Sequence, residues 1–171
     1  CGRFIAYLDS DDYWKKEKLE RQITFMTENR FGACMTSYET VNEDGSFRNI
    51  VHIDERLDYK KFLKKPPTCS HTIMFDTELV DKKALVMPDI RKRQDAATWL
   101  QVIKLYGCLH GFDEVLAANR KRSDSLSANK VSAVKGTWFL YTEIEGLSKP
   151  YAGYCLFWQM FHAVLKRIGK R

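Results

Sequence analysis

The sequence predicts an α/β domain followed by a helical carboxyl-terminal segment. Three observations lead to this prediction. An apolar run near the amino terminus ends in a group of acids, strand-like and helix-like segments alternate up to residue 128, and helical periodicity continues over residues 129–171. At 171 residues, the chain is long enough for one domain with a substantial core.

The apolar run carries the first candidate site. Residues 4–8 are predicted to form a short strand buried on both faces, as at the centre of a parallel sheet. Asp9, Asp11 and Asp12 follow at once, where open α/β sheets place their ligands. Carboxylates this close repel one another unless a cation lies among them, and Mg²⁺ or Mn²⁺ is the usual choice. The alternative is an acidic turn that caps the next helix.

Composition narrows the class of protein and its partners. With 44% hydrophobic and 29% charged residues the chain is globular. No apolar run approaches the ~20 residues of a membrane span. Five cysteines without a Cys-x-x-Cys pair indicate neither a disulfide framework nor a zinc site, and fit a reducing cytoplasm. The net charge of +6 indicates polyanionic partners, which include nucleotide phosphates, anionic lipid and nucleic acid.

Periodicity and turn signals predict the elements that follow. They are a helix at 15–29, hairpin strands at 31–41 and 47–53, a basic helix at 58–65, and strands at 69–75 and 112–118. In the first helix we expect Leu19 on the buried side and Lys18 on the exposed side. We interpret His52 as structural. Ser70 and His71, as neighbours on a strand, should point to opposite faces and line a polar pocket without direct chemistry.

A second candidate site surrounds the start of a predicted helix at Asp95. Its buried side is expected to contain Trp99 and Leu105, together with Leu100 and Ile103. The helix dipole alone would explain an acid in the first turn. However, the carboxylate follows the basic run 91–93 and precedes an aromatic residue, a combination that suits a phosphorylated or sugar-like ligand.

The carboxyl-terminal third is basic and aromatic. The cluster at 119–123 is either a solvated loop or a clamp for a diphosphate. Helices are predicted at 129–144 and 149–168, with a break at Gly146. The last helix is rich in aromatics and ends in cations, so it either lies on an anionic membrane surface or packs on its own domain.

Several of these segments, in order, resemble the motifs of family 2 glycosyltransferases of the GT-A type. They are residues 4–14, 17–19, 93–100 and 119–130, and the resemblance spans nearly the whole chain. It implies a truncated GT-A fold with a mixed sheet flanked by helices. Residues 1–128 would be a partial catalytic domain without its amino-terminal, nucleotide-binding half, and residues 129–171 a helical extension. The chain starts at Cys1 and enters a strand at once, which leads to the same expectation.

The resemblance also implies an inverting transfer of sugar from a nucleotide-diphospho-sugar donor to an acceptor hydroxyl, with Mg²⁺ or Mn²⁺. The acceptor would be a saccharide or lipid-linked saccharide in surface polysaccharide synthesis. Asp95 matches the general base. The metal contacts of the family are matched by Asp11 and Asp9. The contacts to the donor are matched by Asp9, Asp12, Arg120 and Arg122, and the residues on the acceptor side by Trp99, Arg93 and Ser70. Relatives often carry His where this chain has Arg122.

Further expectations follow from the resemblance. The fragment itself should be inactive, its exposed sheet edge could pair in a homodimer, and its location should be cytoplasmic, at the inner face of the membrane if the last helix binds there. An aspartyl-nucleophile phosphatase is one alternative, but Tyr13 stands where that class needs Thr or Val. A basic nucleic-acid-binding module is the other; without a recognised motif, we expect no nucleic-acid partner.

Overall fold

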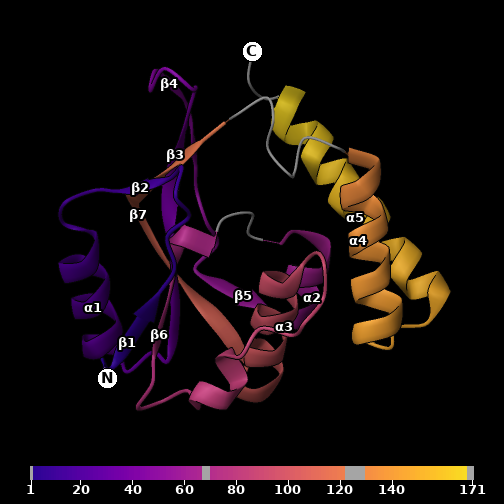
Figure 1. Ribbon diagram of the computed structural model, residues 1–171, viewed down its shortest axis with the longest axis horizontal. Coiled ribbons are helices and arrows are strands. Elements are labelled where there is room, and N and C mark those ends of the chain that lie inside the picture. Colours follow the sequence, from indigo (N-terminus) through magenta and orange to yellow (C-terminus); the bar gives the residue numbers. More distant parts are fainter. Residues whose placement is uncertain (1, 67–69, 122–129, 169–171) are drawn as a thin grey trace.

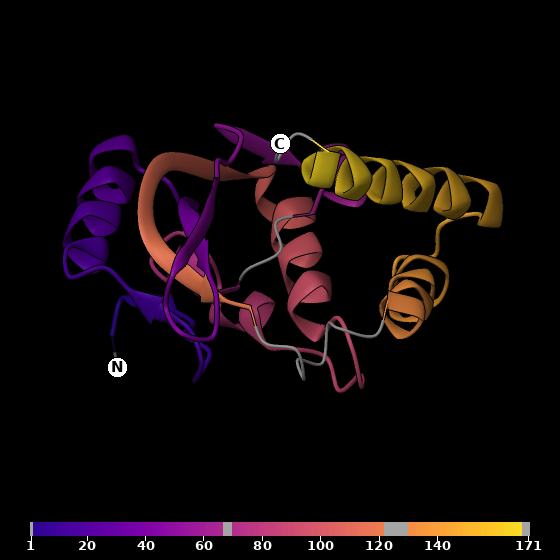
Figure 2. The ribbon, with the colours of Figure 1, turned by 90° about the horizontal axis from the view of Figure 1, so that it is seen from above.

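The computed structural model describes residues 2–66, 70–121 and 130–168 (Figure 1). A curled, mixed sheet forms its centre, with helix α1 on one side and helices α2 and α3 on the other (Figures 1 and 2). Helices α4 and α5 lie at the end of the molecule opposite α1. The predicted α/β fold with a mixed sheet flanked by helices is confirmed.

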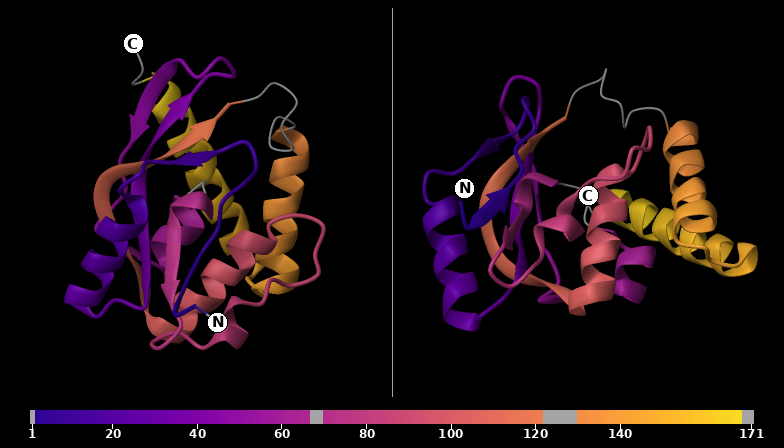
Figure 3. Two further views of the ribbon diagram at one scale, coloured as in Figure 1. Left: turned by 60° about the vertical axis from the view of Figure 1, so that its left-hand side comes forward. Right: turned by 60° about the horizontal axis from the view of Figure 1, so that its bottom comes forward.

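The seven-stranded sheet has the order β1-β6-β3-β7-β2, with β4 paired to β3 and β5 paired to β7. The strands are β1 (Phe4–Ala6), β2 (Tyr13–Trp14), β3 (Ala33–Val41), β4 (Phe47–Val51), β5 (Arg56–Asp58), β6 (Ile73–Asp76) and β7 (Cys108–Arg120). Only β3 and β7 run parallel. Their pairing shifts register on both sides of Ser37. The strand β7 is strongly bent along its length (Figure 3).

The helices follow the predicted order. They are α1 (Lys18–Asn29), α2 (Tyr59–Lys64), α3 (Gln94–Tyr106), α4 (Lys130–Phe139) and α5 (Lys149–Ile168), with 3-10 turns η1 (Ser70–Thr72) and η2 (Lys82–Leu85) and a π-helical turn η3 (Leu140–Ile144). Asp58 caps α2 by accepting a hydrogen bond from the Lys61 backbone N–H at 2.9 Å. The predicted break before the last helix is confirmed, because Gly146 has a φ of +65°.

Three local predictions were wrong. β1 lies at the end of the strand order, is only half-buried and pairs antiparallel with β6, so it is not a central strand of a parallel sheet in this chain. In α1, Lys18 is fully buried and Leu19 is 45% exposed, because Lys18 has polar partners beneath the helix. Leu105, near the end of α3, is 61% exposed rather than buried.

The main core lies between the sheet and helices α2 and α3, and extends to η3 and α5. Trp99 is buried there, with its ring 5.2 Å from that of Tyr7 and 5.1 Å from that of Phe75. These edge-to-face and tilted contacts join α3 to β6 and to the segment after β1. The core therefore fixes the start of α3 relative to the acidic segment.

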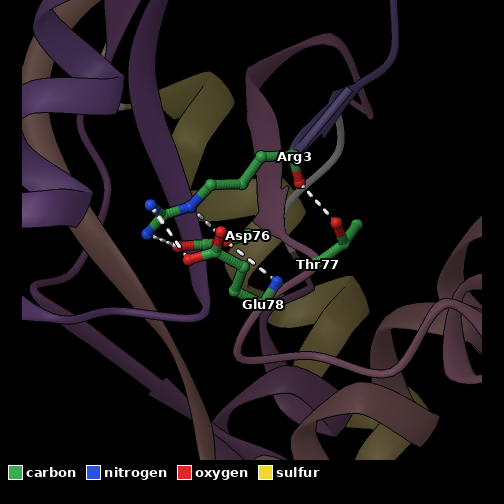
Figure 4. Close-up of polar contacts among 4 residues, drawn as sticks. All are labelled: Arg3, Asp76, Thr77 and Glu78. Carbon is green, nitrogen blue, oxygen red and sulfur yellow. Dashed lines mark hydrogen bonds and ion pairs between the residues drawn. The ribbon is translucent and has the colours of Figure 1, made fainter. Parts of the chain in front are cut away.

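An ion pair attaches the edge strand β1 to the sheet (Figure 4). Arg3 donates from Nε and Nη2 to the two carboxylate oxygens of Asp76, at 2.9 and 2.6 Å. The Glu78 backbone N–H also donates to Asp76, and Thr77 donates to the carbonyl of Arg3. Asp76 is buried, and the bond from Arg3 holds the pKa of its carboxyl below the ordinary value.

Replacing Arg3 with alanine should lower the urea midpoint of unfolding, because it leaves the buried Asp76 carboxylate without its cation. The pKa of Asp76 is depressed on folding, so the contribution is complete above the unfolded value of 3.8 and is lost as the pH falls through the folded value. The difference in urea midpoint between wild type and Arg3→Ala should therefore become smaller in acid. Arg48→Ala, at an exposed position, serves as control; a pH-independent gap would contradict this account.

Candidate functional site

Four segments that are distant in sequence meet at one place. They are the loop between β1 and β2, which carries the acids, the turn η1, the amino-terminal end of α3, and the last residues of β7. Side chains from these segments form a continuous polar network. The network brings together most of the predicted site residues.

Asp12 is the centre of this network. Its carboxylate lies 2.7 Å from Nδ1 of His71 and accepts hydrogen bonds from the Asn119 amide, at 3.2 Å, and from the Arg120 backbone N–H, at 2.8 Å. The side chain is 3% exposed. Burial alone would raise the pKa of Asp12, but the bonds from His71, Arg120 and Asn119 outweigh it and hold the pKa below its ordinary value. Asp12 is therefore an ionised cross-link between the loop, η1 and β7.

The turn η1 carries two functional side chains. Ser70 donates a hydrogen bond to Oδ2 of Asp95 at 3.1 Å, and His71, which is fully buried, faces Asp12. Because η1 is a 3-10 turn and not a strand, adjacent residues are not forced to opposite faces. The predicted strand at 69–75 was wrong in this part, since β6 begins only at Ile73.

A buried polar layer holds η1 in place from below. Trp14 donates from its indole N–H to the carbonyl of His71 at 2.8 Å, and Gln22 donates to the carbonyl of Thr72 at 3.0 Å. Lys18 donates to Oε1 of Gln22 at 2.6 Å, and its ammonium lies 4.5 Å from the centre of the Trp14 ring. Burial lowers the pKa of Lys18 to about 8.

Asp9 and Asp11 form the open side of the network. Within the described residues, neither side chain makes a hydrogen bond, whereas Asp12 is saturated with donors. The pKa of Asp9 is raised, first by partial burial, then by the charge of Asp12, with smaller contributions from Asp11 and Asp95, while His71 opposes the shift. Four carboxylates thus converge on a small region, and two of them are unpaired.

This arrangement fits a divalent cation. Ligand atoms of Asp9, Asp12 and His71 lie within 4.8 Å of one another. Since Asp12 already accepts several hydrogen bonds, Asp9 and its neighbour Asp11 are the carboxylates available to an ion. Carboxylate oxygens are the donors that Mg²⁺ and Mn²⁺ prefer.

Comparison with known proteins places the chain in a family. The profile described as glycosyl transferase family 2 matches residues 2–84. TuaG of Bacillus subtilis (strain 168), whose name assigns it to teichuronic acid biosynthesis as a glycosyltransferase, is 41% identical over 168 residues, 98% of this chain. The chain belongs to glycosyl transferase family 2.

Other family 2 relatives and a solved structure agree. The Escherichia coli UDP-Glc:alpha-D-GlcNAc-diphosphoundecaprenol beta-1,3-glucosyltransferase WfgD is 31% identical over 140 residues, 80% of this chain. The crystal structure of S. aureus TarS residues 1–349 in complex with UDP-GlcNAc superposes with a TM-score of 0.62 at 17% identity, over 93% of this chain, and shows a common GT-A-type fold. The chain spans 66% of TuaG, 53% of WfgD and 48% of that TarS chain.

The other predicted residues of the family 2 site take different positions. Trp99 lies in the core rather than at an open surface. Arg93, at φ +66° before α3, lies beside Gly136 of α4 and acts on the pKa of Tyr141. Arg120 ends β7, and its Nε is buried without a partner among the described residues. Arg122 lies outside the described residues.

Sequence reasoning missed two residues of the network, His71 and Asn119. The predicted strand at 69–75 includes His71, but a strand at this position does not indicate the contact of His71 with Asp12. Asn119 was seen only as part of a basic cluster. The exposed His52, predicted to be structural, pairs with Asp113 at 2.8 Å away from the network. The short polar stretch before β6, residues 70–72, was the sequence feature that could have indicated a turn here, because it interrupts an otherwise apolar predicted strand.

Replacing Gln22 with leucine should destabilise the fold by about 2–4 kcal/mol, because it removes the hydrogen-bond acceptor of the buried Lys18 ammonium and a donor to the Thr72 carbonyl. Lys18→Met combined with Gln22→Leu should recover part of this loss, since it removes the unpaired charge as well. Urea unfolding measures both. Gln101→Leu, on the exposed side of α3, is the matched control. A double variant no more stable than Gln22→Leu would contradict the role of the buried pair.

Proposed function

We propose that this protein transfers a sugar, with inversion, from a nucleotide-diphospho-sugar to the hydroxyl of a saccharide or lipid-linked saccharide in the synthesis of a surface polysaccharide. The observation that carries the proposal is the convergence of Asp9, Asp11 and Asp12 with Asp95. Membership of family 2 and the names of TuaG and WfgD support it. The TarS structure holds UDP-GlcNAc, a donor of the proposed kind.

In this proposal Asp11 and Asp9 hold Mg²⁺ or Mn²⁺ beside the diphosphate of the donor. When bound, the ion neutralises charge that develops on the leaving nucleoside diphosphate. Arg120, whose Nε has no partner among the described residues, adds a cation on the side of β7. Asp12 acts indirectly, because its bonds to His71 and to the Arg120 backbone hold the acidic loop in position.

Asp95 is the proposed general base, which accepts the proton of the acceptor hydroxyl during attack on the anomeric carbon. Its position at the start of α3 is set by the core packing of that helix, and Ser70 donates a hydrogen bond to one of its oxygens. The second oxygen accepts only a local backbone bond, from Ala96. The carboxylate can therefore turn one oxygen toward a substrate. We assign Trp99 and Arg93 no direct contact in this step.

The alternative functions have less support. An aspartyl-nucleophile phosphatase would need a free nucleophilic carboxylate with a Thr or Val two residues after the second acid, and Tyr13 is found there. The nucleic-acid-binding alternative relied on aromatic residues that the structure places mainly on α5 and in the core. Membership of a transferase family favours neither alternative.

In the complete protein, Asp95→Asn should lower kcat for sugar transfer by about 10²–10⁴-fold, because it removes the base, while binding of the nucleotide-sugar remains near wild type. Asp11→Ala should instead weaken donor binding and its dependence on Mn²⁺. Transfer assays with a panel of nucleotide-sugars, together with calorimetric titration, separate the two effects.

Asp89→Asn, an exposed acid a few residues before α3, is the matched control and should behave as wild type. Unchanged transfer in both site variants would overturn the residue assignment. Absence of nucleotide-sugar binding in the wild type would overturn the function itself. Residues 1–171 alone, which span only part of each relative, should bind and turn over donor poorly.

We also propose that residues 1–171 dimerise through the edge of β1. This strand pairs with β6 on one side and has no partner strand on the other among the described residues. Free backbone N–H and C=O groups on an edge strand favour pairing with a second copy. Light scattering should give the mass of a dimer. The backbone N–H of Ala6 points away from β6, because the bond from the Thr77 N–H to the Arg3 carbonyl sets the alternation of the β1–β6 ladder. Ala6→Pro should therefore return the protein to a monomer, since proline cannot donate to a second copy. A monomer at all accessible concentrations would exclude this contact.

A further inference from the structure

Helix α5 has an unusual distribution of charge. Lys149 and Lys166 are its nearest charged residues on either side of a stretch of sixteen residues, 150–165, that contains no Asp, Glu, Lys or Arg. One side of this stretch packs against the protein. Ala152 and Cys155 are fully buried there, and Gln159 donates a hydrogen bond to the carbonyl of Leu63 in α2 at 2.9 Å.

The opposite side of α5 is apolar and exposed. Five of its side chains are each 43–60% exposed: Tyr154, Phe157, Met160, Phe161 and Val164. At 3.6 residues per turn these positions fall within an arc of about 120°, and the buried positions fall outside it. The helix lies at the end of the molecule away from α1 (Figures 1 and 2).

A lysine borders this apolar face. The Nζ of Lys64 lies 5.2 Å from the centre of the Tyr154 ring, and Lys60 and Lys61 of the same short helix α2 are exposed. Residues 129–171 contain seven Lys or Arg against two Glu, which is nearly all of the chain's net charge of +6. One of the two acids, Glu145, is already paired with Lys104 at 3.1 Å. The partner of the face should therefore be both apolar and anionic.

We propose that α5 lies flat on an anionic membrane surface, with this five-residue face in the boundary between headgroups and acyl chains. An exposed aromatic arc bordered by lysines is the arrangement that binds such a surface. No helix among the described residues is long and apolar enough to cross a membrane, so the contact is interfacial. It does not depend on the transfer reaction proposed above.

The charges favour a bilayer over a second copy of the chain. Pairing of two α5 helices would bring together two copies of residues 129–171, each with seven Lys or Arg against two Glu. These like charges repel one another. An anionic surface, in contrast, attracts the cations of this segment.

The test is co-sedimentation of the complete protein with vesicles of phosphatidylglycerol or of phosphatidylcholine. We expect binding to phosphatidylglycerol that weakens with salt, and little binding to phosphatidylcholine. Phe157→Ser with Phe161→Ser should reduce the partition coefficient about tenfold or more, since each phenyl ring loses its apolar environment. The control is Val86→Ser with Leu105→Ser, at two exposed apolar positions outside α5, which should bind as wild type.

Circular dichroism and sedimentation equilibrium complete the experiment. Folded wild-type protein that does not bind phosphatidylglycerol vesicles would overturn the proposal. The proposal would also be overturned if both double variants bound these vesicles as wild type does. A dimer that the α5 variant abolishes, without any vesicle binding, would identify a second copy as the occupant of the face and would also overturn it.

Discussion

The carboxylate of Asp12 is the constraint on which the arrangement of the site depends. It joins three segments, since His71, Asn119 and the Arg120 backbone all direct donors at it. A carboxylate that is 3% exposed is costly to bury unless each of these donors is in place. The acidic loop, η1 and the end of β7 are therefore fixed together or not at all. Because Asp12 takes this role, Asp9 and Asp11 remain free for a ligand.

A second polar layer, beneath η1, explains why a lysine is buried in this small domain. Lys18, Gln22 and Trp14 together satisfy the His71 and Thr72 carbonyls and the charge of the lysine itself. A buried ion costs more than an apolar side chain of the same size, so its benefit lies in specifying one arrangement of the turn. The groups proposed to do chemistry are thus positioned by residues that lie outside the proposed site.

Much of the fold could be predicted from local signals. The 42–46 turn predicts the β3–β4 hairpin, the Pro-Pro dipeptide at 66–67 predicts the end of the basic helix, and Gly146 predicts the break between the last two helices. The errors came from long-range effects. The burial of Lys18 requires the Trp14 ring on β2 and Gln22, which also donates to the Thr72 carbonyl in η1. The contact of His71 with Asp12 requires a turn that periodicity cannot reveal. The apolar composition of β1 predicts a central strand, because composition depends on whether a strand has apolar neighbours. Its position in the sheet depends instead on which strands pair with it.

The charges of the site bear on how it responds to a cation. Asp9 carries a raised pKa because burial and three neighbouring carboxylates disfavour its ionised form. A cation at this position would offset that repulsion and favour the ionised form of Asp9. Asp12, however, is held by hydrogen bonds from the protein alone. The loop is therefore held in position by groups of the protein itself, and in the proposed reaction the ion would supply charge rather than the fold of the site.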